Sequence, residues 1–273
     1  MIAEQAAAAG RYIYAIVNDE GESAGKTDGG FPWTPEPLGF DGGPVYTISE
    51  GRAAAVVSDV PNRPLRPERR NLATHYDVLK RLMSQSAVLP MGFGTIADSA
   101  ESILRILQIH QEALLRQLRR VEGKFEMGLR VSWSVPNIFE HFVSTHPELR
   151  DLRDKLFRPG CDPSPREKIA LGQLFDRTLN AERVAHTLSV VGALRPACFE
   201  IKDNKVRDER EVMNLACLVG RDAQARFEEG VFNAAREFND AYTFDISGPF
   251  PPHNFVDLDL RAEEICAGSA ACS

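Results

Sequence analysis

The hydrophobic residues of the first part of the chain fall into short runs, which indicate strands. The run RYIYAIV at 11–17 is rich in aromatic and β-branched side chains and predicts a buried strand. The segments VYTIS and AAAVVS then flank Glu50-Gly51, where glycine can adopt the positive φ that a tight turn needs. We therefore expect a β-hairpin around Gly51.

Two helices are predicted after these strands. Hydrophobic residues recur at helical spacing and predict a helix over about 67–85. The segment SAVLPMGFGT predicts a short strand that ends at Pro90, then a glycine-rich turn. The turn opens onto a second amphipathic helix that begins near Ala97, and Gly123 ends this helix as a C-cap.

From residue 124 the pattern changes to strict alternation. Hydrophobic and polar side chains alternate from Phe125 to Trp133, which is the period of a strand. A long helical stretch over about 136–192 follows and is interrupted by the breaker RPGCDPSP. After the breaker, the helix is expected to pack through one face, which consists of Leu171, Leu174, Thr178, Ala181, Ala185 and Leu188.

The remaining pattern completes the second block. Alternating runs at 197–201 and 213–219 read as an antiparallel pair of strands, a helix is expected over about 221–238, and a last strand ends at Ser247-Gly248. The order is therefore βαββαβ. This order is the signature of a ferredoxin-like fold, here with several helices in the first connection.

The sequence thus predicts an α+β protein with two domains. We expect a flexible start at 1–10, an N-terminal α+β domain at 11–123, and a ferredoxin-like domain at 124–247 with a helical extension at about 136–192. Residues 248–273 are expected to form a tail that docks between the domains.

Two segments without periodicity carry aromatic side chains. Residues 18–44 are dense in glycine, proline and acidic residues and predict a long loop. Its aromatic residues Phe31, Trp33 and Phe40 either pin the loop to the surface or contact a partner.

The tail contains the segment SGPFPPHNFV, in which prolines favour extended backbone and hydrophobic side chains supply anchors. Its candidate contact residues are Phe250, Pro251, Pro252 and Phe255. They either contact a partner or close the core between the two domains.

Composition narrows the class of protein. With 43% hydrophobic and 26% charged residues the chain should fold, and its net charge of -7 argues against nucleic acid as a partner. We expect no membrane segment, because no stretch has the roughly 18 uninterrupted apolar residues of a span. The start lacks the basic and apolar regions of a signal peptide, so a cytoplasmic location is expected. Five scattered cysteines without a CxxC pair are expected to be reduced thiols.

Motifs for catalysis or cofactor binding are missing from the sequence. It contains no P-loop, no GxGxxG and no HExxH string. The segment Met91-Gly92-Phe93-Gly94-Thr95 reads either as a phosphate cradle or as a tight turn in which Phe93 fills the core. We favour the turn and predict no catalytic, cofactor-binding or metal-binding residue and no small-molecule substrate.

Several of these segments also occur together in a known family. In chain order they are RYIYAIV, VVSDVP, RRNLATHYDVLKRLM, VLPMGFGT, GKFEMGLRVSW and YTFDISGPFPPHNFV. In that order and spacing, from about Arg11 to Val256, they resemble the F/L family of gas vesicle proteins, and RRNLATH is closer to the F branch. Gly92 stands where the family usually carries a basic residue, so a role tied to that residue does not transfer. The loop at 18–44 is longer than the usual connection.

The resemblance implies a function as well as a fold. Members of the family accompany the small, very apolar shell protein of gas vesicles, limit its aggregation during nucleation, and can remain as a minor vesicle component. It therefore implies the shell protein and other gas vesicle accessory proteins as partners, and a location at the vesicle in the cytoplasm. Two other readings stay open: a small-molecule-binding or enzymatic ferredoxin-like protein, and an interaction scaffold outside gas vesicles.

Overall fold

The computed structural model describes residues 9–19, 39–160 and 162–257. The chain divides into two compact units. Unit 1 consists of Met1–Glu126 and Pro249–Ser273, and unit 2 consists of Met127–Gly248. Both combine an antiparallel sheet with helices, so the α+β class predicted from the sequence is confirmed.

Unit 1 is built on a five-stranded sheet. Its strands are β1 (Ala9–Asn18), β2 (Tyr46–Glu50), β3 (Ala53–Pro61), β4 (Val88–Pro90) and β5 (Ile96–Ala97). The order is β2-β3-β1-β4, and β5 also pairs with β1. The predicted hairpin joins β2 to β3 through Gly51, whose φ is +60°. Strand β5 was not predicted, because two residues carry no periodicity.

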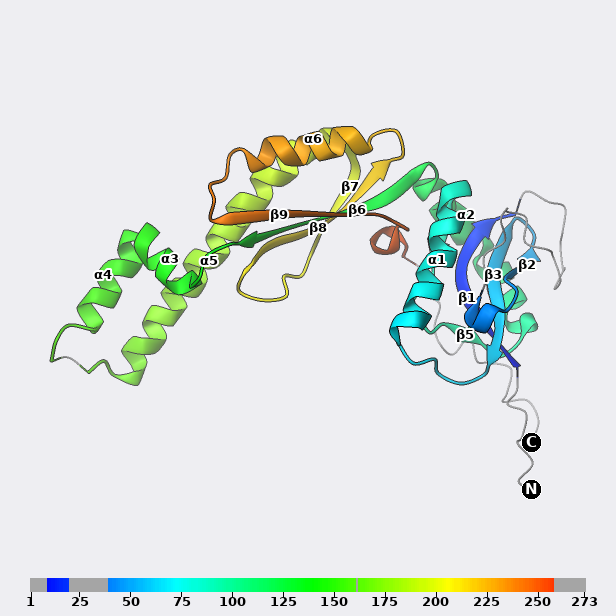
Figure 1. Cartoon of the computed structure of the whole chain (residues 1–273), viewed down its shortest axis with the longest axis horizontal. Coiled ribbons are helices and arrows are strands. Elements are labelled where there is room, and N and C mark those ends of the chain that lie inside the picture. The colour runs from blue at the N-terminus through cyan, green and yellow to red at the C-terminus, as the bar shows by residue number, and fades with distance from the viewer. Residues whose placement is uncertain (1–8, 20–38, 161, 258–273) are drawn as a thin grey trace, which may run out of the picture. The chain divides into compact units, whose positions relative to one another are not determined.

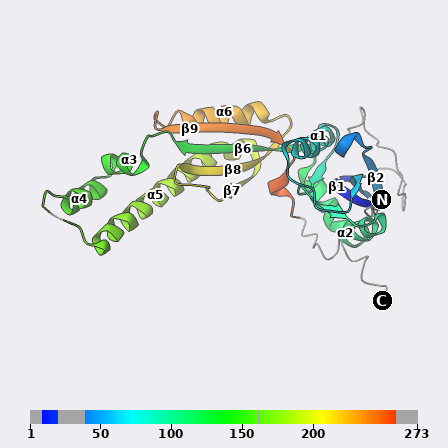
Figure 2. The same ribbon diagram turned by 60° about the horizontal axis from the view of Figure 1, so that its bottom comes forward.

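Helices cover both faces of this sheet, as Figure 2 shows. They are α1 (Arg69–Gln85) and α2 (Ala100–Val121). One face of β1 packs with α2 in a hydrophobic cluster that includes Ile13, Ile16 and Leu107. The aromatic side chains Tyr12 and Tyr14 of β1 are also fully buried. Burial on both faces explains why the sequence of β1 is hydrophobic without a break.

Unit 2 has a four-stranded sheet with the order β7-β8-β6-β9. The strands are β6 (Lys124–Trp133), β7 (Cys198–Asn204), β8 (Glu211–Gly220) and β9 (Tyr242–Phe250). The first strand of the four, β6, lies between the third and the fourth, and this is the strand order of a ferredoxin-like sheet. Strands β7 and β9 form its two edges.

The helices of unit 2 lie in the two connections between these strands (Figure 1). The first connection contains α3 (Ile138–Thr145), α4 (Pro147–Leu156) and α5 (Pro165–Leu194), and the second contains α6 (Gln224–Ala235). Helix α5 begins with a capping box, in which Ser164 and Glu167 bond to each other's backbone. With 30 residues it is about 45 Å long, so it is long enough to contact both α4 of the extension and β8 of the sheet.

The predicted packing face of α5 is wrong in part. Ala181, Ala185 and Leu188 are exposed, and Leu188 retains 68% of its accessible surface. Leu171 is buried as predicted, and the other buried side chains of the helix are Leu179, Val190 and Leu194. The helix is apolar on two faces, and the sequence pattern alone does not say which of them meets the sheet.

Arg183 of α5 fixes the turn between β7 and β8. Its guanidinium donates to the backbone oxygens of Asp208, Glu209 and Glu211 at 2.9–3.1 Å. It also lies over the ring of the buried Trp133, 5.6 Å from the centroid. This side chain therefore holds the long hairpin of the sheet against the helix.

Candidate functional site

The candidate contact residues predicted from the sequence differ in how far they are exposed, and two of them are not described. Phe31 and Trp33 lie outside the described residues. In the tail, Phe250 ends β9 with 40% of its surface exposed, whereas Pro251 and Pro252 are buried. Phe255 is completely buried, so its ring is not on a surface that a partner could meet.

The described part of the tail binds to unit 1 by specific hydrogen bonds. The backbone N–H and side-chain amide of Asn254 donate to the two carboxylate oxygens of Glu126, at 2.8 and 2.6 Å. Glu126 is buried, so these bonds offset the cost of removing its charge from water. Further along, Gln117 of α2 donates to the backbone oxygen of Asp257 at 2.9 Å. Docking of the tail between the two domains stays a prediction.

The loop at 18–44 is described only near its end. There Phe40 is buried in the short 3₁₀ helix Phe40–Gly42, and its ring lies 4.6 Å from that of Tyr12 and 5.8 Å from that of Tyr14. Phe40 thus pins this part of the loop to unit 1.

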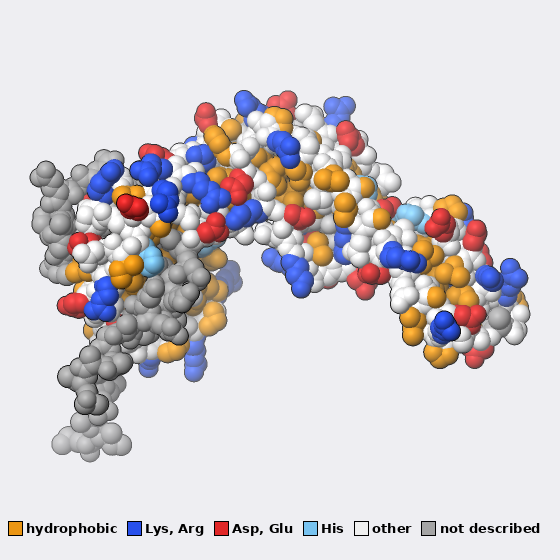
Figure 3. All heavy atoms as spheres, turned by 180° about the vertical axis from the view of Figure 1, so that it is seen from behind, with side chains coloured by type: hydrophobic (Ala, Val, Ile, Leu, Met, Phe, Trp, Pro, Cys, Tyr) orange, Lys and Arg blue, Asp and Glu red, His pale blue; other side chains and the backbone are white. Residues whose placement is uncertain are grey.

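Four exposed apolar residues in the second half of α5 form a stripe along one side of the helix, which we call the α5 stripe. Its members are Ala181, Val184, Ala185 and Leu188. Val184 and Leu188 are 60% and 68% exposed, and Phe232 of α6 is 65% exposed. Hydrophobic side chains gather over the helical layer of unit 2 in Figure 3. These residues recur at helical spacing in the sequence, and for that reason Ala181, Ala185 and Leu188 were predicted to pack in the core.

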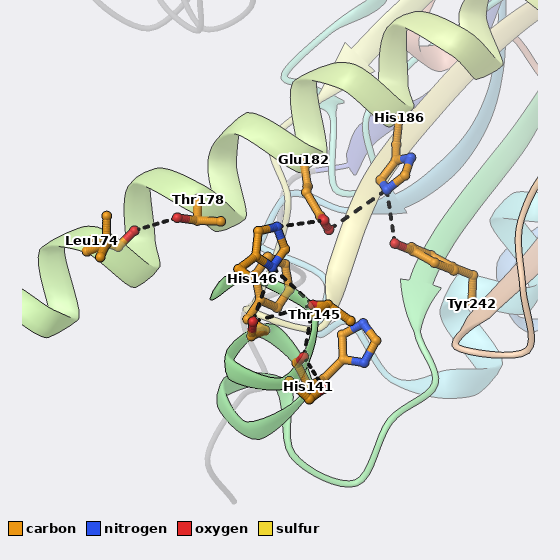
Figure 4. A network of polar contacts seen from close by, with 10 residues as sticks. His141, Thr145, His146, Leu174, Thr178, Glu182, His186 and Tyr242 are labelled. Carbon is orange, nitrogen blue, oxygen red and sulfur yellow. Dashed lines mark hydrogen bonds and ion pairs between the residues drawn. The ribbon is translucent and has the colours of Figure 1, made fainter. Parts of the chain in front are cut away.

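A polar network joins the α3–α4 corner to α5 and β9 (Figure 4). One carboxylate oxygen of Glu182, in α5, lies 3.1 Å from Nε2 of His146. The other carboxylate oxygen of Glu182 lies 3.9 Å from Nε2 of His186. His186 Nε2 is also 2.9 Å from the hydroxyl of Tyr242. Burial lowers the pKa of His186, against the opposing effect of Glu182, and raises the pKa of Tyr242. These bonds hold the α3–α4 corner, α5 and β9 together.

A second network lies inside unit 1, around the glycine-rich turn. The backbone N–H of Gly94 donates to the hydroxyl of Tyr12 at 3.1 Å, and this hydroxyl lies 2.9 Å from Nδ1 of the buried His75. The N–H of Thr95 bonds to the backbone oxygen of Gly92 at 3.3 Å. Phe93 packs edge-on against His75, at 5.8 Å between centroids. These two N–H groups have protein partners, which supports a tight turn rather than a phosphate cradle.

Burial perturbs the titratable groups of this network. It lowers the pKa of His75 to about 4, an effect that His253 increases and the backbone of Met91 opposes. It also raises the pKa of Tyr12, and it raises that of Tyr14 to about 12. His75 is therefore a neutral hydrogen-bonding group at neutral pH.

An open hollow in unit 1, with a volume of about 630 Å³, contains several charged side chains. Its charged residues are Arg11, Asp59, Asp98 and Glu101. Arg11 pairs with Asp59 at 3.2 Å, and Asp98 accepts a hydrogen bond from Ser102 at 2.6 Å, near the start of α2. The first contact joins β1 to β3, and the second stabilises the start of α2.

The described residues also bear on metal sites and membrane segments. No group of three or more histidine, cysteine or acidic side chains in the described ranges is arranged to hold a metal ion. None of the helices in that part of the chain is long and apolar enough to cross a membrane.

Comparison with known proteins gives one consistent family. The model of the gas vesicle synthesis protein GvpL/GvpF family matches residues 10–257. Gas vesicle protein F of Streptomyces sp. (strain CB03234) is 27% identical over 246 residues, which cover 90% of this chain and 99% of the relative. Gas vesicle protein F of Dolichospermum flosaquae is 27% identical over 231 residues, with 84% and 94% covered.

Solved structures show the same fold. The crystal structure of GvpF from Anabaena sp. PCC7120 superposes with a TM-score of 0.77 at 21% identity, covering 92% of this chain and 99% of that one. GvpF from Microcystis aeruginosa gives a TM-score of 0.75 at 19% identity, with 91% and 99% covered. The resemblance seen in the sequence is thus confirmed over nearly the whole chain, and the protein belongs to the gas vesicle synthesis protein GvpL/GvpF family.

Proposed function

We propose that the protein is a non-catalytic gas vesicle assembly factor of the F branch. It binds the hydrophobic shell protein and other accessory proteins in the cytoplasm, limits aggregation of the shell protein during nucleation, and can stay on the vesicle as a minor component. The observation that carries this proposal is the family match over residues 10–257. The relatives named above are F proteins, which favours that branch.

The α5 stripe is a suitable surface for an apolar partner. A shell subunit with large apolar faces self-associates, and a protein that covers those faces shifts this equilibrium by mass action. Burial of an exposed leucine contributes about 1.5–3 kcal/mol to such a contact. Phe250, with 40% of its surface exposed, is a second candidate contact. The proposal involves no substrate, cofactor or catalytic step.

The proposal is tested by co-expression of the protein with the shell protein, followed by pull-down and by antibody probing of washed vesicles. We expect co-purification, a signal on the vesicles, and defective vesicles after gene deletion. The absence of any association, together with normal vesicles in the deletion strain, overturns the assignment and leaves a role outside gas vesicles.

Two substitutions locate the contact surface. Leu188→Asp places a charge on the α5 stripe, and we expect at least about a tenfold loss of affinity for the shell protein. Ile109→Asp is the matched control, because Ile109 is a similarly exposed side chain, at 65% against 68%, on α2 of unit 1. Equal loss in both variants, or in neither, contradicts a role for the stripe in particular.

A further inference from the structure

Two cysteines of unit 2 lie on neighbouring strands and contact each other. Cys198 is the first residue of β7, and Cys217 lies within β8. In the register of this antiparallel pair, Cys198 lies opposite Val219 and Cys217 lies opposite Ile201. Both cysteines are thus on the same face of the sheet, and their thiols share a hydrogen bond.

The strand pairing is irregular next to these thiols. The register shifts between Cys198 and Glu200, so that Phe199 is the extra residue of a β-bulge. A bulge bends its strand and increases the local twist. Here it occurs at the beginning of β7, an edge strand, next to Cys198.

The two thiols differ in their access to solvent. Cys217 is completely buried, whereas Cys198 is half-buried and lines a pocket of about 270 Å³. The pocket is also lined by Asp222 and Arg226, and Arg226 is held by a bond to the backbone oxygen of Pro196 at 3.4 Å. A small molecule can therefore reach Cys198 and not Cys217.

The hydrogen bond also makes Cys198 more acidic. The bond from Cys217 lowers the pKa of Cys198, and this effect outweighs the burial that acts in the other direction. A thiolate is the nucleophilic form of cysteine. Cys198 is thus the reactive member of the pair, and Cys217 is the thiol placed beside it.

We propose that Cys198 and Cys217 form a peroxide-sensitive thiol pair that closes reversibly to an intrachain disulfide. The Cys198 thiolate attacks one oxygen of a hydroperoxide, the O–O bond breaks, and the products are a sulfenic acid and water or an alcohol once the leaving oxygen takes a proton. The thiol of Cys217 then loses its proton and attacks the Cys198 sulfur. The S–S bond forms, the S–O bond breaks, and the hydroxide leaves with that proton as water.

The electrons of this sequence balance without another reagent. Each of the two sulfurs gives one electron, and one peroxide is reduced by two. A dithiol reverses the step by thiol–disulfide exchange. The bridge would tie the start of the edge strand β7 to the central strand β8. This inference is independent of the proposed role in vesicle assembly.

The test uses the full chain carrying C161S, C266S and C272S, so that only the proposed pair can react. The folded protein is treated with hydrogen peroxide, and unreacted thiols are alkylated. Mass spectrometry of the intact chain and of peptides without reduction then detects the bridge. We expect the loss of two hydrogen atoms, a peptide that joins Cys198 to Cys217, and reversal by dithiothreitol.

Two variants separate the roles of the cysteines. In Cys217→Ser, which keeps a hydrogen-bond donor, Cys198 should stop at the sulfenic acid and be trapped by dimedone. In Cys198→Ala the buried Cys217 should resist peroxide. Circular dichroism checks that both variants fold. The proposal is overturned if the pair stays reduced in the folded protein and oxidises only in urea. It is also overturned if Cys217→Ser, which keeps a hydrogen-bond donor beside Cys198, leaves Cys198 unreactive towards peroxide.

Discussion

Lowering the pH should weaken unit 1 through His75, in addition to any effect of His253, whose pKa burial also lowers. His75 of α1 is 1% exposed, and its Nδ1 lies 2.9 Å from the hydroxyl of Tyr12, which in turn accepts the N–H of Gly94. With neutral His75, the Tyr12 hydroxyl donates to Nδ1 and every partner is satisfied. A proton on Nδ1 removes that acceptor and places a charge away from water, so protonation opposes the folded state.

The magnitude follows from the two pKa values. The pKa of His75 is about 4 in the folded protein, against an ordinary value of about 6.5 in the unfolded chain. Because the folded pKa is the lower one, the unfolded chain takes up the proton first as pH falls. The free energy of unfolding that is lost through His75 is close to zero at pH 7. It reaches about 2 kcal/mol at pH 5 and about 3 kcal/mol at pH 4.

The assay compares the protein with His75→Gln, which cannot titrate in this range. Amide hydrogen exchange of α1, corrected for the intrinsic rate at each pH, gives the free energy of opening. Between pH 7 and pH 5 the unsubstituted protein should lose about 2 kcal/mol more than the variant. An NMR titration of the imidazole gives the pKa directly. Equal pH dependence in the two proteins, or titration of His75 near its ordinary pKa, refutes the reasoning.

Three further substitutions test other parts of the fold. Asn254→Ala leaves the buried carboxylate of Glu126 without its side-chain donor, so unit 1 should lose about 1–3 kcal/mol and the tail should become sensitive to protease; unchanged cleavage contradicts this. Gly51→Ala forces a side chain into a φ of +60° and should lower the free energy of unfolding by about 1–2 kcal/mol, seen as a lower urea midpoint; an equal midpoint counts against it. Arg183→Lys loses the forked contact with the β7–β8 turn and should destabilise unit 2 by about 1–3 kcal/mol, with a changed emission of Trp133; an unaltered spectrum and stability speak against this role.

Local patterns in the sequence were enough for most of the elements. The alternation from Phe125 to Trp133 predicted β6, which spans Lys124–Trp133. Gly51 marked the hairpin between β2 and β3 because the positive φ depends on the residue at the turn itself. The ferredoxin-like order followed from the order of these elements along the chain, and the strand order β7-β8-β6-β9 has the same connectivity.

Features that depend on distant residues could not be predicted in the same way. The stripe on α5 has hydrophobic spacing like a core face, and only the position of the sheet shows that Leu188 is exposed. The bulge at Phe199 depends on the partner strand, which the sequence of β7 does not specify. The contact between Tyr12, His75 and Gly94 joins residues far apart in the chain, and no local sequence motif predicts it.

The division of the chain into units has a consequence for synthesis. Unit 1 is formed by two separate segments, and the whole of unit 2 is encoded between them. A growing chain therefore completes the sequence of unit 2 before it supplies Asn254 and Phe255 to unit 1. Until then, the carboxylate of Glu126 lacks the two hydrogen bonds from Asn254 and the site of Phe255 is unfilled. The tail residues thus close the first unit only after the whole sequence of the second has been synthesised.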